Sequence, residues 1–522
     1  MRIRTSMGSE REGTERTGEA RLLETLVAEL DGAAVDPGAE QPPSIAGITD
    51  GSEDVVEGAL FIAIRGTEVD GHAFIGEAVE RGAAAVVADR EYTGKPGVPV
   101  VRVPDTRRAS AELASAWYGH PARRLRLVGI TGSIGKTSVL AMLEAMLLQA
   151  RRRVGTVGSL GVNVAGETRT ETGHTVPGPL LLHRELARIA DEGCELAAME
   201  VTSHALVQER VHGLRFDLGV FTNLVPLEHS EYHDSLRDYT NAKRRFFDHL
   251  RPCVPLIYNV DDKVVRRLVR ESHAEPVGCG TGRAALVKVQ PGRMDADGIR
   301  FTLDVRRPLP TVHAGERPAG SWGFHLRLLG HSNMMNASLA AAAALCLDVD
   351  PATIEAALAA LEPQPRRLQV VRREPFLVLD DTVGHPDSIS AVFQVVQAFD
   401  PGRVHIAFAV RGQRGPEVNR HAGEALATWA AQVPLGRLAV TRSEGAADER
   451  NRVDPEELEA VEDALRRHGT PHTLHDRLDE AVLEVLEAAG PGDLVLLLGA
   501  QGMDEGQRVA EDWLRSEPGR RH

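Results

Sequence analysis

The 522-residue sequence has few cysteines and no long apolar run. Its four cysteines, Cys194, Cys253, Cys279 and Cys346, include no Cys-x-x-Cys pair, so neither a disulfide framework nor a structural zinc site is indicated. No apolar run reaches the ~18 residues that a transmembrane helix needs; the nearest, residues 337–347, is typical of an Ala-rich core helix. We therefore expect a cytoplasmic protein without membrane insertion.

Basic residues are also fewer than acidic residues. The chain has 60 Lys and Arg against 75 Asp and Glu, a formal net charge of −15, which argues against nucleic-acid or anionic-membrane binding. Residues 1–20 are polar and lack an apolar core, so we predict a disordered tail and not a signal peptide. Small-molecule substrates and a monomeric state are expected.

The length suggests about three domains of ordinary size, ~100–200 residues each. Short β-type runs alternate with helical stretches over residues 21–122, and apolar strands alternate with helices over residues 123–363. After the proline-containing segment 362–365, a third α/β unit covers residues 364–522. This alternation predicts an α/β fold with a mostly parallel central sheet, and short strands between Cys279 and Leu329 indicate an inserted or edge β-region.

The most informative segment is Val128-Gly129-Ile130-Thr131-Gly132-Ser133-Ile134-Gly135-Lys136-Thr137-Ser138. An apolar strand precedes it and an apolar-periodic helix follows to Leu148, although the spacing departs from the standard G-x-x-x-x-G-K. Glycines let backbone N–H groups approach phosphate, and a helix N-terminus adds its positive dipole end. Lys136 can reach the β- and γ-phosphates and the Thr137 hydroxyl can ligate Mg²⁺. An ordinary helix cap is the alternative interpretation.

Three further segments carry candidate chemistry. Glu200 follows the buried run 196–199, and at the carboxyl end of a parallel strand it would face the phosphate loop as a Mg²⁺ ligand, the alternative being a surface carboxylate. His229 and His233 stand among carboxylates and suit metal or phosphate binding, although such a loop is more often polar surface. Lys243 lies on a predicted helix over residues 239–247, and taken alone it is interpreted as a solvated side chain.

Together these residues resemble the Mur ligase family of ATP-dependent, amide-forming enzymes, most closely the branch that adds the third amino acid of a peptide. The resemblance covers roughly residues 45–510. It rests on Gly58 to Gly66, Asp70-Gly71-His72, Tyr118-Gly119-His120-Pro121, the Gly-Lys-Thr loop, Met199 to Val211, Asn259-Val260-Asp261-Asp262 and Gly330 to Ala337. It implies a three-domain architecture with a central P-loop-type sheet and a Rossmann-like C-terminal domain.

The resemblance also implies a role for each matching residue. ATP and Mg²⁺ are the expected cofactors, with an acyl phosphate formed on the acceptor carboxylate. Mg²⁺ ligands would be Thr137, Glu200, His229 and a carbamylated Lys243; the nucleotide would contact Gly132, Gly135, Lys136, Ser138, Asn333, Asn336, Arg367 and Asp381. The substrates would contact Thr175, Ser203, Gln208, Arg210 and Arg414.

Departures from the family pattern concentrate on the substrate side. The family's Asp-Ser-Arg near uridine reads Asp50-Gly51-Ser52, and its Thr-Thr-Pro reads Thr175-Val176-Pro177. The Asp-Asn-Pro-Arg that grips diaminopimelate is replaced around Arg442-Ser443-Glu444-Gly445. Because a site built from buried polar groups rejects ligands that leave them unpaired, we expect a different amine.

Our interpretation is an ATP- and Mg²⁺-dependent ligase that joins a UDP-N-acetylmuramoyl-peptide type of carboxylate to an amine. The first alternative is a relative redeployed to another carboxylate and amine, such as those of a specialised metabolite. The second is a catalytically silent nucleotide-binding scaffold, against which the intact set Lys136, Thr137, Glu200, His229 and Lys243 argues.

Overall fold

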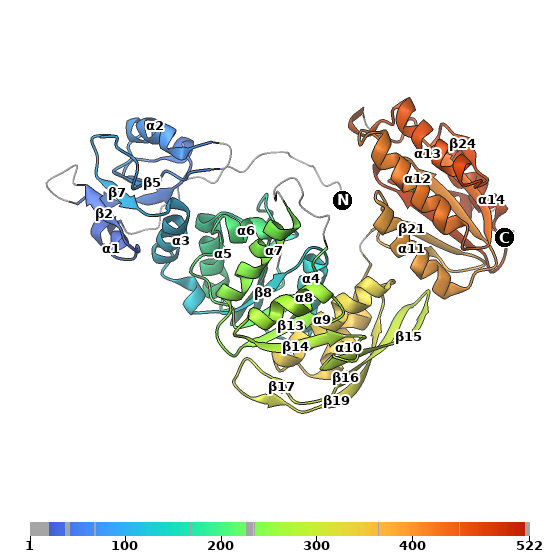
Figure 1. The fold of residues 1–522 in the computed structure, drawn as a ribbon, viewed down its shortest axis with the longest axis horizontal. Coiled ribbons are helices and arrows are strands. Elements are labelled where there is room, and N and C mark those ends of the chain that lie inside the picture. Colours follow the sequence, from blue (N-terminus) through green and yellow to red (C-terminus); the bar gives the residue numbers. More distant parts are fainter. Residues whose placement is uncertain are drawn as a thin grey trace. The chain divides into compact units, whose positions relative to one another are not determined.

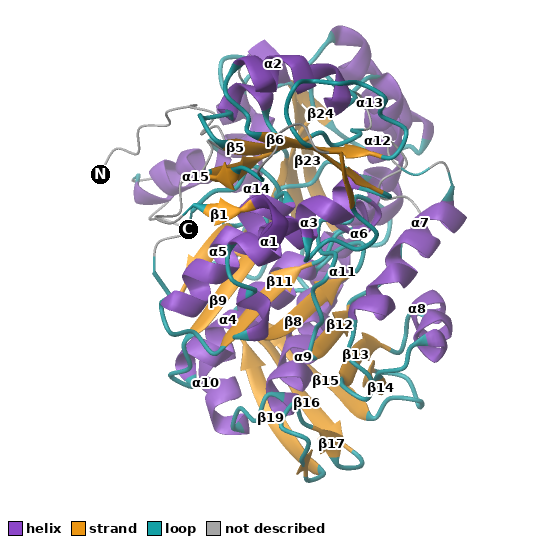
Figure 2. Ribbon diagram, turned by 90° about the vertical axis from the view of Figure 1, so that its left-hand side faces the viewer, coloured by secondary structure: helices purple, strands orange, loops and turns teal. Residues whose placement is uncertain are grey.

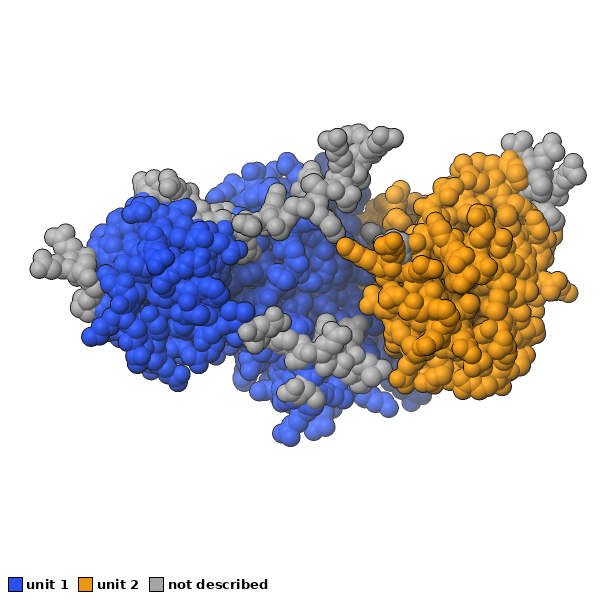
Figure 3. Space-filling view, turned by 90° about the horizontal axis from the view of Figure 1, so that it is seen from above, with its two compact units in different colours: residues 1–288, 305–320, 339–354 blue, residues 289–304, 321–338, 355–522 orange. Residues whose placement is uncertain are grey.

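The computed structural model describes residues 20–36, 42–66, 69–167, 170–225, 233, 235–363, 365–447 and 449–516. All but the last residue of the tail predicted at residues 1–20 lies outside the described residues. The chain divides into two compact units, coloured separately in Figure 3. Unit 1 comprises residues 1–288, 305–320 and 339–354, and unit 2 comprises residues 289–304, 321–338 and 355–522.

Unit 1 begins with a five-stranded sheet in the order β2-β7-β6-β5-β4, in which only β2 is antiparallel to its neighbour. Its apolar strands are covered on both faces: Leu60 and Phe61 are adjacent in β5 but belong to different core clusters. The elements here are β1 (Arg21–Leu22), α1 (Leu23–Val27), β2 (Ala34–Asp36), β3 (Ser44–Ile45), β4 (Gly47–Thr49), β5 (Ala59–Ile62), α2 (Ile75–Glu80), β6 (Ala85–Asp89), β7 (Val100–Val103) and α3 (Thr106–Trp117).

The second sheet of unit 1 runs in the order β10-β9-β11-β8-β12-β13-β14, of which β8, β13 and β14 are labelled in Figure 1. Helix α4 packs against β8, β9 and β11, while α5 packs against β9 and β10 (Figure 2). The elements are β8 (Arg126–Thr131), α4 (Lys136–Gln149), β9 (Val154–Gly158), β10 (Gly161–Val164), α5 (Pro179–Asp191), β11 (Leu196–Glu200), α6 (Ser203–Val207), β12 (Leu218–Phe221), α7 (Leu236–Arg244), β13 (Pro255–Asn259), α8 (Lys263–Leu268) and β14 (Glu275–Gly280).

Strand β8 lies between β11 and β12, and both pairings are parallel. Glu200 pairs with Ile130, and Phe221 pairs with Thr131, so all three strands end at nearly the same level. Open α/β sheets bind ligands outside the carboxyl ends of such strands. The fold therefore brings the segments after Ile130, Glu200 and Phe221 to one edge of the sheet.

The predicted β-region before Leu329 is confirmed as β15 (Val287–Asp295), β16 (Gly298–Val305), β17 (Leu309–Pro310), β18 (Glu316–Arg317) and β19 (Gly320–Leu326). It is followed by α9 (His331–Cys346) and α10 (Pro351–Ala360). The predicted Ala-rich core helix is also confirmed, because residues 340–344 of α9 are fully buried. Among the described residues, no helix combines the length and apolarity that a bilayer crossing requires.

The C-terminal part of unit 2 is a six-stranded sheet in the order β20-β21-β25-β22-β23-β24, in which only β20 is antiparallel. Two core clusters form on it, one including α11 and α12 and the other including α14. The elements are β20 (Gln369–Arg372), β21 (Leu377–Asp381), α11 (Pro386–Phe399), β22 (Val404–Ala409), α12 (Pro416–Ala430), β23 (Leu435–Thr441), α13 (Pro455–Arg467), β24 (Thr473–His475), α14 (Leu478–Ala488), β25 (Leu494–Gly499) and α15 (Gly506–Arg515).

Candidate active site

At two positions of the loop between β8 and α4, the backbone adopts a conformation that requires glycine. Gly132 has φ +141° and Gly135 has φ +85°. A Cβ atom at Gly132 would also collide with Oγ1 of Thr222. The glycines therefore let the loop turn tightly against the end of β12 and leave its backbone N–H groups at the start of α4.

Residues from two other segments hold this loop. The Thr222 hydroxyl donates to the carbonyl of Ile134 over 2.7 Å, and Oδ1 of Asn223 accepts from the Ile134 N–H over 3.0 Å. The hydroxyls of Ser133 and Tyr239 lie 2.8 Å apart and share a hydrogen bond. Sequence reasoning assigned no role to these residues. The available signal was the position of Thr222 and Asn223 directly after an apolar strand next to β8.

Lys136 begins helix α4 and folds back over the loop. Its Nζ donates to the carbonyl of Gly132 over 2.9 Å and to that of Ser133 over 2.6 Å. No side chain caps the N-terminus of this 14-residue helix, and Ser138 lies half-buried in its first turn. An uncapped helix N-terminus with an adjacent ammonium group is suited to binding phosphate.

Glu200 is buried beside the first turn of α4, with 1% of its surface exposed. Its Oε1 accepts from the Thr137 hydroxyl over 3.0 Å and from the Ser159 N–H over 2.8 Å. Its Oε2 is buried, and no described residue hydrogen-bonds to it. A buried carboxylate oxygen without a partner is costly, and carboxylate and hydroxyl oxygens are the ligands that Mg²⁺ prefers. Thr137 and Glu200 therefore fit a Mg²⁺ ion.

The other predicted Mg²⁺ ligands are His229 and Lys243. His229 lies outside the described residues. His233 is described, and its ring centre lies 5.2 Å from that of Tyr239. Within the described ranges, no group of three or more His, Cys, Asp or Glu side chains is arranged to hold a metal ion. The predicted magnesium role of Thr137 and Glu200 thus stays a prediction.

Lys243 is buried, so the interpretation of its side chain as solvated is wrong. Only 1% of it is exposed, and its Nζ donates to the Gly132 carbonyl over 2.8 Å and to the Thr131 hydroxyl over 3.3 Å. The ammonium also lies 5.6 Å from the ring centre of Tyr239. Helix α7 therefore directs Lys243 into the phosphate loop and not into solvent.

Two of the four predicted substrate residues of unit 1, Gln208 and Arg210, line a separate hollow, which we call the acceptor pocket, whereas Thr175 and Ser203 do not. It has a volume of about 410 Å³ and is lined by Asp50, Ile64, Gly66, Arg107, His174, Gly178, Pro179, Gln208 and Arg210. Nε of Arg210 donates to Oε1 of Gln208 over 2.9 Å. Ser203 is fully buried, and its hydroxyl has no hydrogen-bond partner among the described residues. Thr175 shares a 3.0 Å hydrogen bond with the hydroxyl of Ser159, the residue whose N–H holds Glu200.

The remaining predicted nucleotide residues belong to unit 2. Nδ2 of Asn333 donates to the Leu329 carbonyl over 2.7 Å, and Asn336 is 9% exposed. Asp381 accepts from the Leu368 N–H over 2.7 Å, and burial raises the pKa of its carboxyl to about 6. Arg367 is exposed beside this turn. The structure thus shows Asp381 fixing the backbone that carries Arg367.

The segment that replaces the family's diaminopimelate motif lines another hollow in unit 2, of about 490 Å³. Arg442 lines it, but its guanidinium pairs with Glu444 at 3.1 Å and with Asp476 at 2.9 Å. Arg452 lines the same hollow, and the sequence did not indicate a cation from this position. Arg414 is exposed on a neighbouring loop, where its N–H donates to Glu457 over 2.8 Å.

Comparison with known proteins establishes the family. Three family models match: "Mur ligase family, catalytic domain" over residues 44–118, "Mur ligase middle domain" over residues 130–344, and "Mur ligase, glutamate ligase domain" over residues 366–501. The chain belongs to the Mur ligase family. The predicted fold class and enzyme class, an amide-forming ligase, are thereby confirmed.

Individual relatives match nearly the full length. The UDP-N-acetylmuramoyl-L-alanyl-D-glutamate–2,6-diaminopimelate ligase of Geobacillus thermodenitrificans is 34% identical over 94% of this chain and 96% of its own length. A solved structure of a ligase with the same title has a TM-score of 0.71 at 21% identity, covering 92% of this chain and 98% of that one. MurF ligase from Thermotoga maritima, in complex with ADP, has a TM-score of 0.57 at 19% identity, covering 91% and 98%. At these identities the two structures show the fold.

Proposed function

We propose that this protein is an ATP- and Mg²⁺-dependent ligase that joins a UDP-N-acetylmuramoyl-peptide type of carboxylate to an amine or amino acid. The observation that carries the proposal is the convergence of Lys136, Thr137, Glu200 and Lys243 on one glycine loop. The relative from Geobacillus, whose name describes such a carboxylate and an amine, supports the substrate class. Neither alternative, the redeployed ligase or the silent scaffold, is favoured by the comparisons.

Each of these residues has its own role in the proposed reaction. The loop N–H groups and Lys136 bind and orient the triphosphate, and the positive charge of Lys136 offsets charge developing on the γ-phosphoryl group. A bound Mg²⁺, held by Thr137 and Glu200, would supply further charge neutralisation. The acceptor carboxylate attacks the γ-phosphorus, which releases ADP and leaves an acyl phosphate. The amine then attacks the acyl carbon, forms the amide and displaces inorganic phosphate.

The domain roles follow from the same proposal. Residues 21–122 carry four of the nine residues that line the acceptor pocket, residues 123–363 the ATP site, and residues 364–522 the amine side. Thr175 supports an acceptor near the ATP site, because its hydroxyl is hydrogen-bonded to the Ser159 hydroxyl and the Ser159 N–H donates to Glu200. An acceptor bound beside Thr175 would therefore lie next to the phosphate loop, as carboxylate phosphorylation requires.

The test is product formation. The protein is incubated with ATP, Mg²⁺ and pooled amino acids, with and without UDP-N-acetylmuramoyl-L-alanyl-D-glutamate, and products are identified by mass. We expect ADP, phosphate and one new amide, formed only when the acceptor is present. ADP formation that ignores the acceptor, or none with any amine, would contradict the proposal.

A further inference from the structure

The lining of the acceptor pocket favours an anionic ligand. Two arginines, Arg107 and Arg210, line it together with one acidic residue, Asp50. Gly178 and Pro179, the N-cap and the first residue of the 13-residue helix α5, line it as well, and no side chain caps that helix. A helix N-terminus presents unpaired N–H groups and positive dipole charge. Both features attract negative charge to this pocket.

The Arg107 guanidinium is held by a backbone carbonyl and is not paired with a carboxylate among the described residues. Its Nη2 donates to the carbonyl of Arg65 over 2.9 Å, and no acidic side chain in the described part of the chain pairs with it. Its neighbour Arg108 differs, because its guanidinium pairs with Glu209 at 3.2 Å and with Asp105 at 3.9 Å. Of these two adjacent arginines, Arg107 alone lines the pocket. Its charge is thus available to a ligand.

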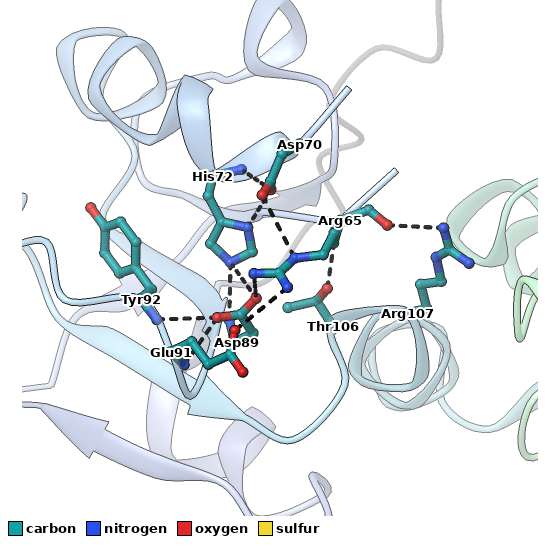
Figure 4. Close-up of polar contacts among 8 residues, drawn as sticks. All are labelled: Arg65, Asp70, His72, Asp89, Glu91, Tyr92, Thr106 and Arg107. Carbon is teal, nitrogen blue, oxygen red and sulfur yellow. Dashed lines mark hydrogen bonds and ion pairs between the residues drawn. The ribbon is translucent and has the colours of Figure 1, made fainter. Parts of the chain in front are cut away.

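Arg65, whose carbonyl holds Arg107, is anchored through its side chain in a polar cluster (Figure 4). The Arg65 guanidinium pairs with Asp89 at 2.6 Å and with Asp70 at 3.6 Å. The Asp89 N–H donates to Nε2 of His72 over 3.0 Å, which leaves the ring proton on Nδ1 to donate to Asp70 over 2.6 Å. The Arg65 guanidinium is therefore paired with carboxylates, and the Arg65 carbonyl orients Arg107 in the pocket lining.

We propose that Arg107 binds a phosphate oxygen of the nucleoside diphosphate carried by the acceptor. The inference rests on the proposed function and adds a specificity residue to it. Asp50 begins the segment that resembles the family's uridine-side Asp-Ser-Arg, and Ser52 stands there in place of the cation. Because Asp50 and Arg107 line the same pocket, α3 brings a cation beside the first residue of this segment. Arginine suits this role, since its planar fork matches phosphate oxygens.

The test compares ligands that differ only in phosphate. Affinities for UDP, UMP and uridine are measured by calorimetry for the wild type and Arg107→Gln, with the phosphate loop saturated by Mg²⁺ and a non-hydrolysable ATP analogue. Losing a charge-assisted hydrogen bond should weaken UDP binding by about 10- to 100-fold. Uridine binding should not change. The matched control Arg108→Gln, one residue along α3, should bind UDP like the wild type.

Kinetics supply a second readout. In Arg107→Gln the KM for the UDP-linked acceptor should rise by a similar factor while kcat stays within about twofold, and Arg107→Lys should recover part of the loss. Unchanged UDP affinity, or an equal loss for uridine, overturns the role of Arg107 while leaving the proposed function in place. A wild-type protein that binds no uridine nucleotide contradicts the proposed acceptor, and the inference falls with it.

Discussion

Nζ of Lys243 donates a hydrogen bond to the carbonyl of Gly132 over 2.8 Å, although 111 positions separate the two residues in the chain. Lys136, the first residue of α4, donates to the same carbonyl over 2.9 Å. Two ammonium groups from different helices thus meet at one oxygen of the phosphate loop. A buried lysine is rare unless it is paired or functional, so this convergence marks the loop as a site for strongly anionic ligands.

Replacing Lys243 by alanine should reduce the rate of ligation by about 100-fold or more, because a charged group at the phosphate loop is lost. If the side chain is carbamylated, acetate should restore part of the activity by occupying the vacated place, whereas bicarbonate should not. The matched control is Arg244→Ala, the next and exposed position of α7. A fully active Lys243→Ala variant would return Lys243 to a purely structural role.

Lys136→Ala should abolish acceptor-dependent ADP formation and leave the fold intact. Removing an electrostatic contact to the transferring phosphoryl group costs ~3 kcal/mol or more, which is about 100-fold or greater in rate. ADP release is followed by a coupled assay, and the fold by thermal unfolding. Lys95→Ala, at an exposed lysine of unit 1, is the control. Wild-type rates in the folded Lys136→Ala variant would disprove the nucleotide-loop assignment.

Unit 1 should lose stability as the pH falls from about 6.5 to about 4. Burial of His183 in α5, reinforced by the nearby His120, lowers its pKa from 6.5 to about 4. Between these values the unfolded chain binds a proton that the folded chain rejects, so acid favours unfolding by roughly 3 kcal/mol at most. Denaturant unfolding across this range should show a shallower slope for His183→Leu. The exposed control His273→Ala should keep the wild-type slope.

Diaminopimelate should be a poor amine for this protein. It carries a second amino-acid head, whose carboxylate needs a cation at the position where the resembling ligases have an arginine. Here that segment continues as Ser443-Glu444-Gly445, and Arg442 is already paired with Glu444 and Asp476. A buried carboxylate without a partner costs several kcal/mol, or about three orders of magnitude in specificity.

The measurement is kcat/KM for diaminopimelate beside that for the best amine of the pool. We expect the ratio to lie far below one. Arg452→Gln serves as the companion variant, because Arg452 lines the same hollow. Efficient ligation of diaminopimelate with micromolar half-saturation, abolished in Arg452→Gln, would show that this arginine has replaced the missing one and that our expectation is wrong.

Local patterns were sufficient to predict the elements that position the phosphate loop. The apolar run over residues 125–130 became β8 (Arg126–Thr131), and the periodic stretch predicted to end at Leu148 became α4, which ends at Gln149. Glu200 was predicted to face the loop because parallel strands end at a common edge, and its pairing with Ile130 places it there. These features depend on periodicity and strand order, which a sequence displays directly.

Other features depend on contacts between distant segments. Helix α7 has Tyr239 and Lys243 one turn apart, and the sequence does not show whether that face meets solvent or a loop more than 100 positions away. Arg107 and Arg108 are identical in type and adjacent, and only the packing of α3 decides which one lines the acceptor pocket. The pairing of Arg442 and the arrival of Arg452 are likewise products of tertiary structure.

The central claim is that the acceptor carboxylate receives the γ-phosphoryl group on this loop. Its most direct test is ligation with an acceptor whose reacting carboxylate carries ¹⁸O at both oxygens. We predict that each turnover transfers one ¹⁸O atom from the carboxylate to the inorganic phosphate that the amine displaces, detected by ³¹P NMR or mass spectrometry. Amide formation with unlabelled phosphate would contradict the account, because the carboxylate oxygen would then never have been bonded to phosphorus.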